Sequence, residues 1–369
     1  MKLLSYAPNL VLPVAALIAL WFPASASAIS GLSPGSIELQ SLGPITFSTS
    51  GVLIVGDPKQ AMVYAIDTAD RRVDGKLSDN LPKDLTSQLA NVLEADAAKI
   101  EIGDLAVNPE TGNVIISARA GNRVRLIRLT ADGKMQPIDL SKIDHAKKQL
   151  PNPPADEVTG EGRRRRNLRD QSITDLAFFD GKIIVSGLSA GASPSSVIEL
   201  PFPFAENTVI TNVEIFHAAH GRVEDAAIQT FIPLNINGEP SLLAGFTCTP
   251  LVNFPIGKLD GDEKVRGKTV AELGNRNRPI DMIVYERDGK QFLLMSNSVR
   301  GVMKLQTDNI NDAPGLTERV AGGGTAGQPF EKIESLSDVS QMDKLNDQQG
   351  IALVAKADTQ PSLIVFDLP

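Results

Sequence analysis

Short apolar runs separated by polar turns recur along almost the whole chain. The stretch 278–307 shows this unit most clearly, with apolar runs at 280–285, 292–296 and 302–305. An Arg-Asp-Gly turn and then a polar loop separate the three runs. Runs of this length between Gly, Asp and Asn clusters are typical of β-strands joined by tight turns. The stretch therefore predicts three consecutive strands.

The unit can be placed six times, at intervals of roughly 50 to 70 residues. In the first unit the expected strands are 45–48, 52–55 and 62–66. Repeats of this length, built from strands without regular helices between them, are typical of β-propellers. We therefore expect an all-β fold, a single propeller of six blades. Seven blades, a solenoid of sheets or two β-sandwiches are the alternatives.

The two ends of the chain predict how the ring closes. The last expected strand, 362–367, has no fourth strand behind it, and segment 36–42 alternates in the period of a strand. We expect 36–42 to complete the last blade, because closure of this kind removes exposed sheet edges. Two stretches, about 77–99 and 141–171, are interpreted as loop insertions, the first helical or irregular.

The N-terminal residues 1–28 have the pattern of a signal peptide. Lys2 precedes an apolar run at 10–22, and an Ala-Ser-Ala site ends at Ala28. This order is typical of a cleaved export signal, and the run is short for a membrane span. We expect a propeller domain at 29–369 in the periplasm or outside the cell, with no transmembrane span after cleavage. A retained anchor is the alternative.

The composition of the chain limits the classes of partner that it is expected to bind. The chain carries 36 Lys and Arg against 44 Asp and Glu, a formal net charge of −8, and an acidic protein of this kind disfavours nucleic acid. Hydrophobic residues make up 42% of the chain, enough for a packed core. The single Cys248 excludes an intrachain disulfide and is expected to be buried. We expect a monomer.

Acidic residues open five of the six units, and this predicts a site. In a propeller the residue that opens each innermost strand lies near one mouth of the central channel, where ligands of closed β architectures usually bind. These residues are Asp104, Asp175, Asp225, Asp281 and Asp338. Loop residues expected on the same rim are Arg119, Arg123, Asn297 and Arg300. The competing interpretation is that each Asp only caps its own turn.

Other candidates are weaker. His217 and His220 are three residues apart and are able to share a metal ion, although a polar loop between units is the simpler interpretation. The run 163–166 is four Arg within a Pro- and Gly-rich stretch, which predicts an exposed loop. No HExxH motif occurs in the sequence.

The repeated units resemble the broad class of exported bacterial propellers with NHL-like or lactonase-like blades. The resemblance is one of architecture, and no specific family motif matches. Six-bladed lactonase-like propellers hold calcium in the channel, so the resemblance implies Ca²⁺ as a candidate, with Asp175, Asp225 and Asp281 as its ligands. The leading hypothesis is a non-enzymatic binding protein that requires no cofactor and takes a protein or small molecule at its channel mouth. The alternative is a divalent-metal-dependent hydrolase or lactonase.

Overall fold

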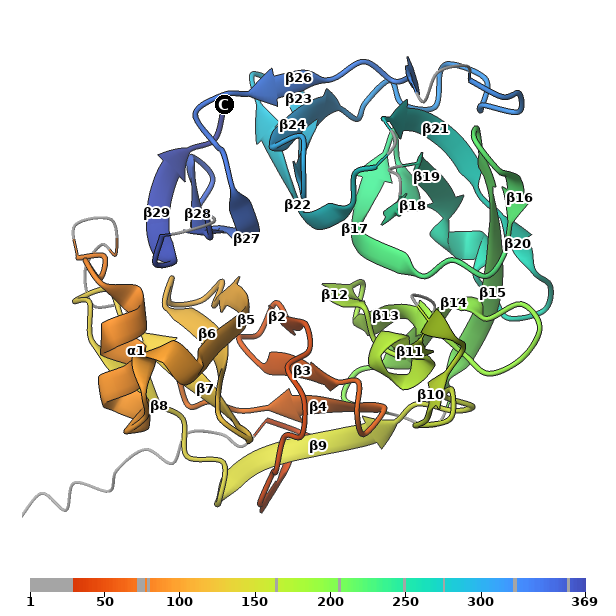
Figure 1. The fold of residues 1–369 in the computed structure, drawn as a ribbon. Coiled ribbons are helices and arrows are strands. Elements are labelled where there is room, and N and C mark those ends of the chain that lie inside the picture. The colour runs from red at the N-terminus through yellow and green to blue at the C-terminus, as the bar shows by residue number, and fades with distance from the viewer. Residues whose placement is uncertain are drawn as a thin grey trace, which may run out of the picture.

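A computed structural model describes residues 29–71, 77, 80–162, 165–204, 207–247, 250–274, 276–320, 324–356 and 359–369. Six small β-sheets stand around a central axis, each sheet forming one blade (Figure 1). The six-bladed propeller expected from the repeats is therefore confirmed. The expected signal peptide, residues 1–28, lies outside the described residues, as does Cys248.

The blades are numbered here by the order of their innermost strands in the chain, and their strands are given from the channel outwards. Blade 1 consists of β2 (Ile45–Phe47), β3 (Leu53–Asp57), β4 (Met62–Ile66), β9 (Ile143–Gln149) and β1 (Ser33–Gly35). Blade 2 consists of β5 (Ile100–Val107), β6 (Val114–Ala120), β7 (Arg123–Leu129) and β8 (Met135–Pro137). Blade 3 consists of β12 (Asp175–Phe179), β13 (Lys182–Leu188), β14 (Ser195–Pro201), β15 (Val209–His217) and β16 (Gly221–Val223), and β20 (Val265–Arg266) pairs with β15.

The remaining blades follow the same plan. Blade 4 consists of β17 (Ile228–Ile236), β18 (Glu239–Phe246), β19 (Pro250–Pro255), β21 (Lys268–Leu273) and β25 (Thr325–Gly327). Blade 5 consists of β22 (Pro279–Arg287), β23 (Lys290–Asn297), β24 (Val302–Gln306) and β26 (Glu331–Ile333). Blade 6 consists of β27 (Val339–Lys344), β28 (Gln349–Val354) and β29 (Ser362–Asp367). Neighbouring strands within each blade are antiparallel, apart from the parallel pair β15–β20.

The order of the blades around the axis differs from their order in the chain. Innermost strand β2 contacts both β5 and β12, while β5 also contacts β27. The ring therefore runs through blades 1, 3, 4, 5, 6 and 2 and returns to blade 1 (Figure 1). The chain builds blade 1 in part, makes blade 2 on one side of it, and returns as β9 before it continues to the other side.

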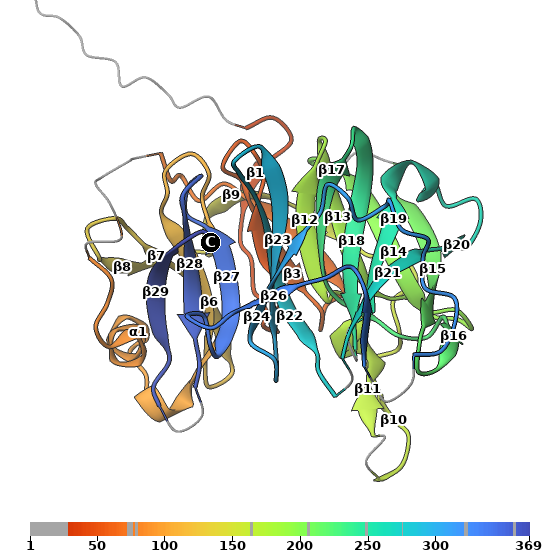
Figure 2. The same cartoon turned by 90° about the horizontal axis from the view of Figure 1, so that it is seen from above.

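This topology corrects two expectations. Segment 36–42 does not complete the last blade: β1 pairs with β9 in blade 1, and Ile37 donates its N–H to the carbonyl of Leu140. The stretch 141–171 is only in part an insertion, because β9 is the fourth strand of blade 1. The rest of the stretch holds the hairpin β10 (Val158–Thr159) and β11 (Arg166–Asn167) and the short 3-10 helix η4 (Leu168–Gln171). The hairpin projects from one face of the ring (Figure 2).

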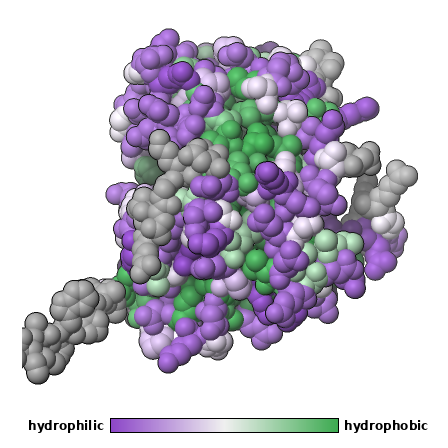
Figure 3. All heavy atoms as spheres, turned by 90° about the vertical axis from the view of Figure 1, so that its left-hand side faces the viewer, coloured by the Kyte–Doolittle hydropathy of each residue, from purple (hydrophilic) through white to green (hydrophobic). Residues whose placement is uncertain are grey.

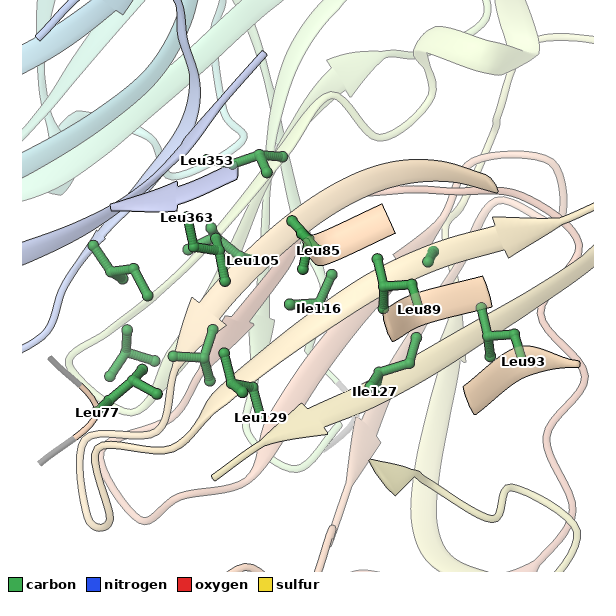
Figure 4. Packing of buried hydrophobic residues seen from close by; sticks show 14 of the residues in the cluster. Leu77, Leu85, Leu89, Leu93, Leu105, Ile116, Ile127, Leu129, Leu353 and Leu363 are labelled. Atoms are coloured by element: carbon green, nitrogen blue, oxygen red, sulfur yellow. The ribbon is translucent and has the colours of Figure 1, made fainter. Parts of the chain in front are cut away.

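Six apolar clusters hold the ring together, one between each pair of neighbouring blades. The cluster between blades 2 and 6 also contains helix α1 (Leu85–Leu93), which lies within the stretch 77–99 that was expected to be helical or irregular. Asp84 begins the helix by accepting the N–H of Ser87. Leu85, Leu89 and Leu93 recur every four residues and point from one helix face toward blade 2 (Figure 4).

The other short helices are η2 (Ala97–Lys99) and η5 (Ile256–Lys258). Among the described residues, no helix has the length and apolar character needed to cross a membrane.

Candidate functional site at the channel mouth

Three of the five expected aspartates lie at corresponding places in the innermost strands. Asp104 in β5, Asp175 in β12 and Asp281 in β22 each accept the N–H of the next residue in their own strand on Oδ1. These nitrogen–oxygen distances are 2.8, 2.8 and 2.7 Å. A side chain bonded to its own backbone in this way is a local cap, so the capping interpretation accounts for one oxygen of each carboxyl.

The second oxygen of each carboxyl reaches the next blade. Oδ2 of Asp104 accepts the N–H of Ile45 in β2 at 2.8 Å, and Oδ2 of Asp175 accepts that of Phe231 in β17 at 2.8 Å. Oδ2 of Asp281 accepts the N–H of Met342 in β27 at 2.6 Å. Each carboxyl therefore ties one inner strand to the next.

Asp343, which the sequence did not predict, repeats the pattern two residues farther along β27. Its Oδ1 accepts the N–H of Lys344 at 2.7 Å, and its Oδ2 accepts that of Val107 in β5 at 2.7 Å. All four carboxyls bridge in the same rotational direction around the ring, at four of its six blade interfaces. We refer to Asp104, Asp175, Asp281 and Asp343 as the channel carboxyls.

Two cavities meet at these carboxyls. The mouth cavity, about 330 Å³, and the inner cavity, about 290 Å³, are both lined by Asp104, Asp175 and Asp281. These three therefore form the waist of the channel, while Asp343 lines the inner cavity only. The rim of the mouth cavity is polar; its side chains include Asp170, Gln171, Thr174, Gln229, Arg278 and Gln341.

The surroundings of the channel carboxyls disfavour their charged forms. Each retains some surface toward the channel but is enclosed by protein on its other sides. Burial raises the pKa of Asp104 to about 8, and the carboxyls of Asp175 and Asp343 add to the rise. Burial likewise raises the pKa values of Asp175 and Asp343 to about 6, against the opposing effect of their backbone donors.

The pKa of Asp281 depends on two neighbouring carboxyls as well as on burial. Burial and the nearby carboxyls of Asp104 and Asp175 hold the pKa of Asp281 well above its usual range. The three groups at the waist are therefore coupled, and ionisation of one opposes ionisation of the next. A positive charge placed between them relieves this repulsion.

The other two expected aspartates are not in the channel, so that part of the expected ring was wrong. Asp225 is exposed before β17 begins at Ile228. In β17 the position equivalent to Asp281 is occupied by Thr230. Each of these two residues directly follows a shift in the strand register. Asp338 is exposed in the turn before β27, where its φ of 58° is left-handed. Gln341 takes the corresponding place in β27.

The four loop residues expected on the rim do not line the mouth cavity. Arg119 pairs with Glu101, and Arg123 is exposed as the first residue of β7. Asn297 is buried and bonds to Asn277, the carbonyl of Met295 and the carbonyl of Gly301. Arg300 packs against Gly274. The expectation failed because these positions lie in or beside the second and third strands of their blades, which stand farther from the axis than the innermost strands.

His217 and His220 lie away from the channel, at the outer side of blade 3. The His217 Nδ1 is 3.2 Å from Oε1 of Glu272 in blade 4, and the two imidazole rings meet edge to face at 4.8 Å. Among the described residues, no group of three His, Cys, Asp or Glu side chains is arranged to hold a metal ion. Of the Arg run at 163–166 the structure describes Arg165 and Arg166, both exposed, and Arg166 begins strand β11.

Comparisons with known proteins do not assign this chain to a family. No family model matches the chain, and no curated protein matches it. Among solved structures it is similar to one of the mitotic checkpoint complex, with 8% identity, 100% of this chain and 99% of that chain covered, and a TM-score of 0.34. The extracellular region of plexin A4 gives 9% identity and a TM-score of 0.40 over 91% of this chain, which spans only 40% of that one.

A third similar structure is the PQQ-bound aldose sugar dehydrogenase from Streptomyces coelicolor, with 9% identity, 91% of this chain and 98% of that chain covered, and a TM-score of 0.29. At these identities and TM-scores none of the likenesses carries an argument about activity.

Proposed function

We propose that this chain is an exported, non-enzymatic binding protein whose channel mouth takes a small ligand with a positively charged group. The observation that carries the proposal is the position of Asp104, Asp175 and Asp281 at the floor of the mouth cavity. Their mutual repulsion and raised pKa values make a cation the ligand whose binding gains most from the site. A cavity of about 330 Å³ suits a small molecule rather than a polypeptide.

The rim favours a ligand with polar groups as well as a charge. Gln229, Gln341 and Thr174 offer both donors and acceptors around the opening, and Arg278 adds one exposed cation. The described lining residues of the mouth include no His, Cys or Ser that would serve as nucleophile or imidazole base. Backbone N–H groups already bond to both oxygens of each waist carboxyl, so these side chains are held in fixed positions for binding.

A divalent cation on the same carboxyls, in support of hydrolysis, is the second candidate. The repulsion among the three waist groups favours it, and oxygen ligands of this kind suit Ca²⁺. Asp225 cannot join such a site from its exposed place outside the channel. The absence of a metal-spaced group of three among the described residues makes the organic cation our first choice.

Binding is tested with putrescine as a small diamine and, separately, with CaCl₂. We expect the diamine to raise the melting temperature, because a ligand that binds only the folded state at a hundredfold excess over its dissociation constant adds about 2.7 kcal/mol. Its affinity should rise between about pH 5 and about pH 8, because the raised pKa values keep the carboxyls protonated at the lower pH. Differential scanning calorimetry and isothermal titration measure both quantities.

Asp281→Asn should abolish most of this response, and Asp338→Asn is the matched control because its carboxylate is exposed outside the channel. Stabilisation by CaCl₂ with no response to the diamine would favour the second candidate. No response to either probe, or an equal response in Asp281→Asn, would reject the channel as a cation site.

A further inference from the structure

Blade 6 ends on an unpaired strand. Blades 1 to 5 each have at least four strands, whereas β29 is the third strand of blade 6 and pairs only with β28 within the described part of the chain. The N–H of Leu368 is donated to the carbonyl of Gln348, inward toward β28. Because donors alternate along an antiparallel strand, Leu363, Val365 and Asp367 present their N–H and C=O groups outward.

The outermost strands of the other blades are built differently. Each is three residues long, and most carry a Pro or a charge; they are β1 (Ser-Pro-Gly), β8 (Met-Gln-Pro), β16 (Gly-Arg-Val), β25 (Thr-Ala-Gly) and β26 (Glu-Lys-Ile). Short edges with Pro or charges are the usual protection against pairing with another chain. By contrast, β29 has six residues, four of them consecutive apolar residues, with no Pro or Lys. Among the outermost strands that the structure describes, only β29 combines this length with an uninterrupted apolar run.

The side chains around this edge are also incompletely covered. Ile364, Val365 and Phe366 are each only half-buried. Ile364 and Phe366 face blade 5, where the Phe366 ring lies over Gly350, while Leu363 faces blade 2. Figure 3 views the molecule from the side that carries β29 and shows apolar surface gathered between hydrophilic areas.

We propose that β29 pairs with β29 of a second copy of this chain, antiparallel about a two-fold axis at Val365, in place of the monomer expected from the sequence. The register follows from the outward donors, since Val365 then exchanges both backbone bonds with Val365 of the copy. Ile364 comes to lie opposite Phe366, an aromatic and β-branched pair that favours sheet association. Asp367, the one charge in the strand, comes opposite Leu363, so no like charges meet.

Self-complementarity is the reason to choose a second copy as the occupant. A two-fold interface uses the same surface of each copy, and here that surface is β29. The pairing also leaves neither copy with an unpaired β29 edge. Two blades thereby join into a continuous six-stranded sheet, three strands from each copy.

Charge variants at the axis test the interface. The wild-type chain should sediment as a dimer, and V365K should weaken dimerisation by about tenfold or more, because two like charges then face each other. V365E should do the same, whereas an equimolar mixture of V365K and V365E should recover the dimer. V158K is the matched control: it makes the same chemical change at a residue that is 58% exposed in the β10–β11 hairpin.

A second measurement fixes the register. In a C248S background, V365C should form a disulfide between copies on mild oxidation, because directly opposed residues of an antiparallel pair lie within disulfide reach. V158C in the same background should not. A monomeric wild-type chain at all soluble concentrations, or a dimer that V365K leaves intact, would overturn the proposal. So would a mixture of the two charge variants that stays monomeric.

Discussion

The free energy of unfolding is expected to fall as the pH rises from about 4 to about 8. The pKa values of Asp175 and Asp343 are raised to about 6 and that of Asp104 to about 8, and all three titrate near 4 in the unfolded chain. Below pH 4 both states hold these protons, and the stabilising contribution is complete. As the pH rises, the unfolded chain releases its protons first, so the contribution is lost as the pH passes through 6 and then 8.

The slope is large enough to measure. Each proton that the folded state retains and the unfolded state has released lowers the free energy of unfolding by about 1.4 kcal/mol per pH unit. The hydrogen-bonded surface carboxylates act with the opposite sign but in a lower window. The pKa of Asp132, for example, is lowered to about 2 by its bonds to Lys134 and Thr130, so its contribution is lost only as the pH falls below about 4.

Urea denaturation at intervals between about pH 4.5 and about pH 8 measures this slope. Asp281→Asn should flatten it, because the substitution removes a carboxyl whose pKa is held well above its usual range by burial and by Asp104 and Asp175. Asp225→Asn should leave it unchanged, because that carboxylate is exposed outside the channel. A free energy of unfolding that is constant or rising over this range would contradict the assigned burial of the channel carboxyls.

The sequence was sufficient for the blades because their strands are local patterns. Strands β22, β23 and β24 lie where the apolar runs of 278–307 predicted them, joined by the expected turns. Blade order was not predictable in this way. Strand β9 is Ile-Asp-His-Ala-Lys-Lys-Gln, an outer strand that is largely polar because it covers little core, and it pairs with β4 far back in the chain. Its composition resembles a loop, so 141–171 was interpreted as an insertion.

The site was predictable where an expected Asp lies within an innermost strand. Asp104, Asp175 and Asp281 lie within β5, β12 and β22. Asp225 and Asp338 instead precede strands whose corresponding places belong to Thr230 and Gln341. Asp343 was missed because it lies two residues beyond the expected place. Alternation along a strand puts residues i and i+2 on one face, so a search of both positions would have found it. The bridging of Oδ2 to the next blade depends on the ring order and has no local signal.

Asp281→Asn is expected to destabilise the protein at about pH 5 and to do so less, or not at all, at about pH 8. Oδ1 and Oδ2 of Asp281 accept the N–H groups of Met282 and Met342. The amide nitrogen of Asn accepts neither, so one buried donor loses its partner at a cost of about 1–3 kcal/mol. At the higher pH the wild-type chain must also ionise a carboxyl whose pKa burial holds well above its usual range, and the amide avoids this cost.

Chemical denaturation of both proteins at the two pH values gives the comparison. Asp338→Asn is the matched control, because Asn tolerates the left-handed backbone at that exposed turn and surface changes of this kind stay within about 0.5 kcal/mol. An Asp281→Asn chain as stable as wild type at pH 5 would show that the link between β22 and β27 contributes nothing. An equal loss at both pH values would show that the link matters but that ionisation of Asp281 carries no cost, and the channel would then lose its electrostatic reason to bind a cation.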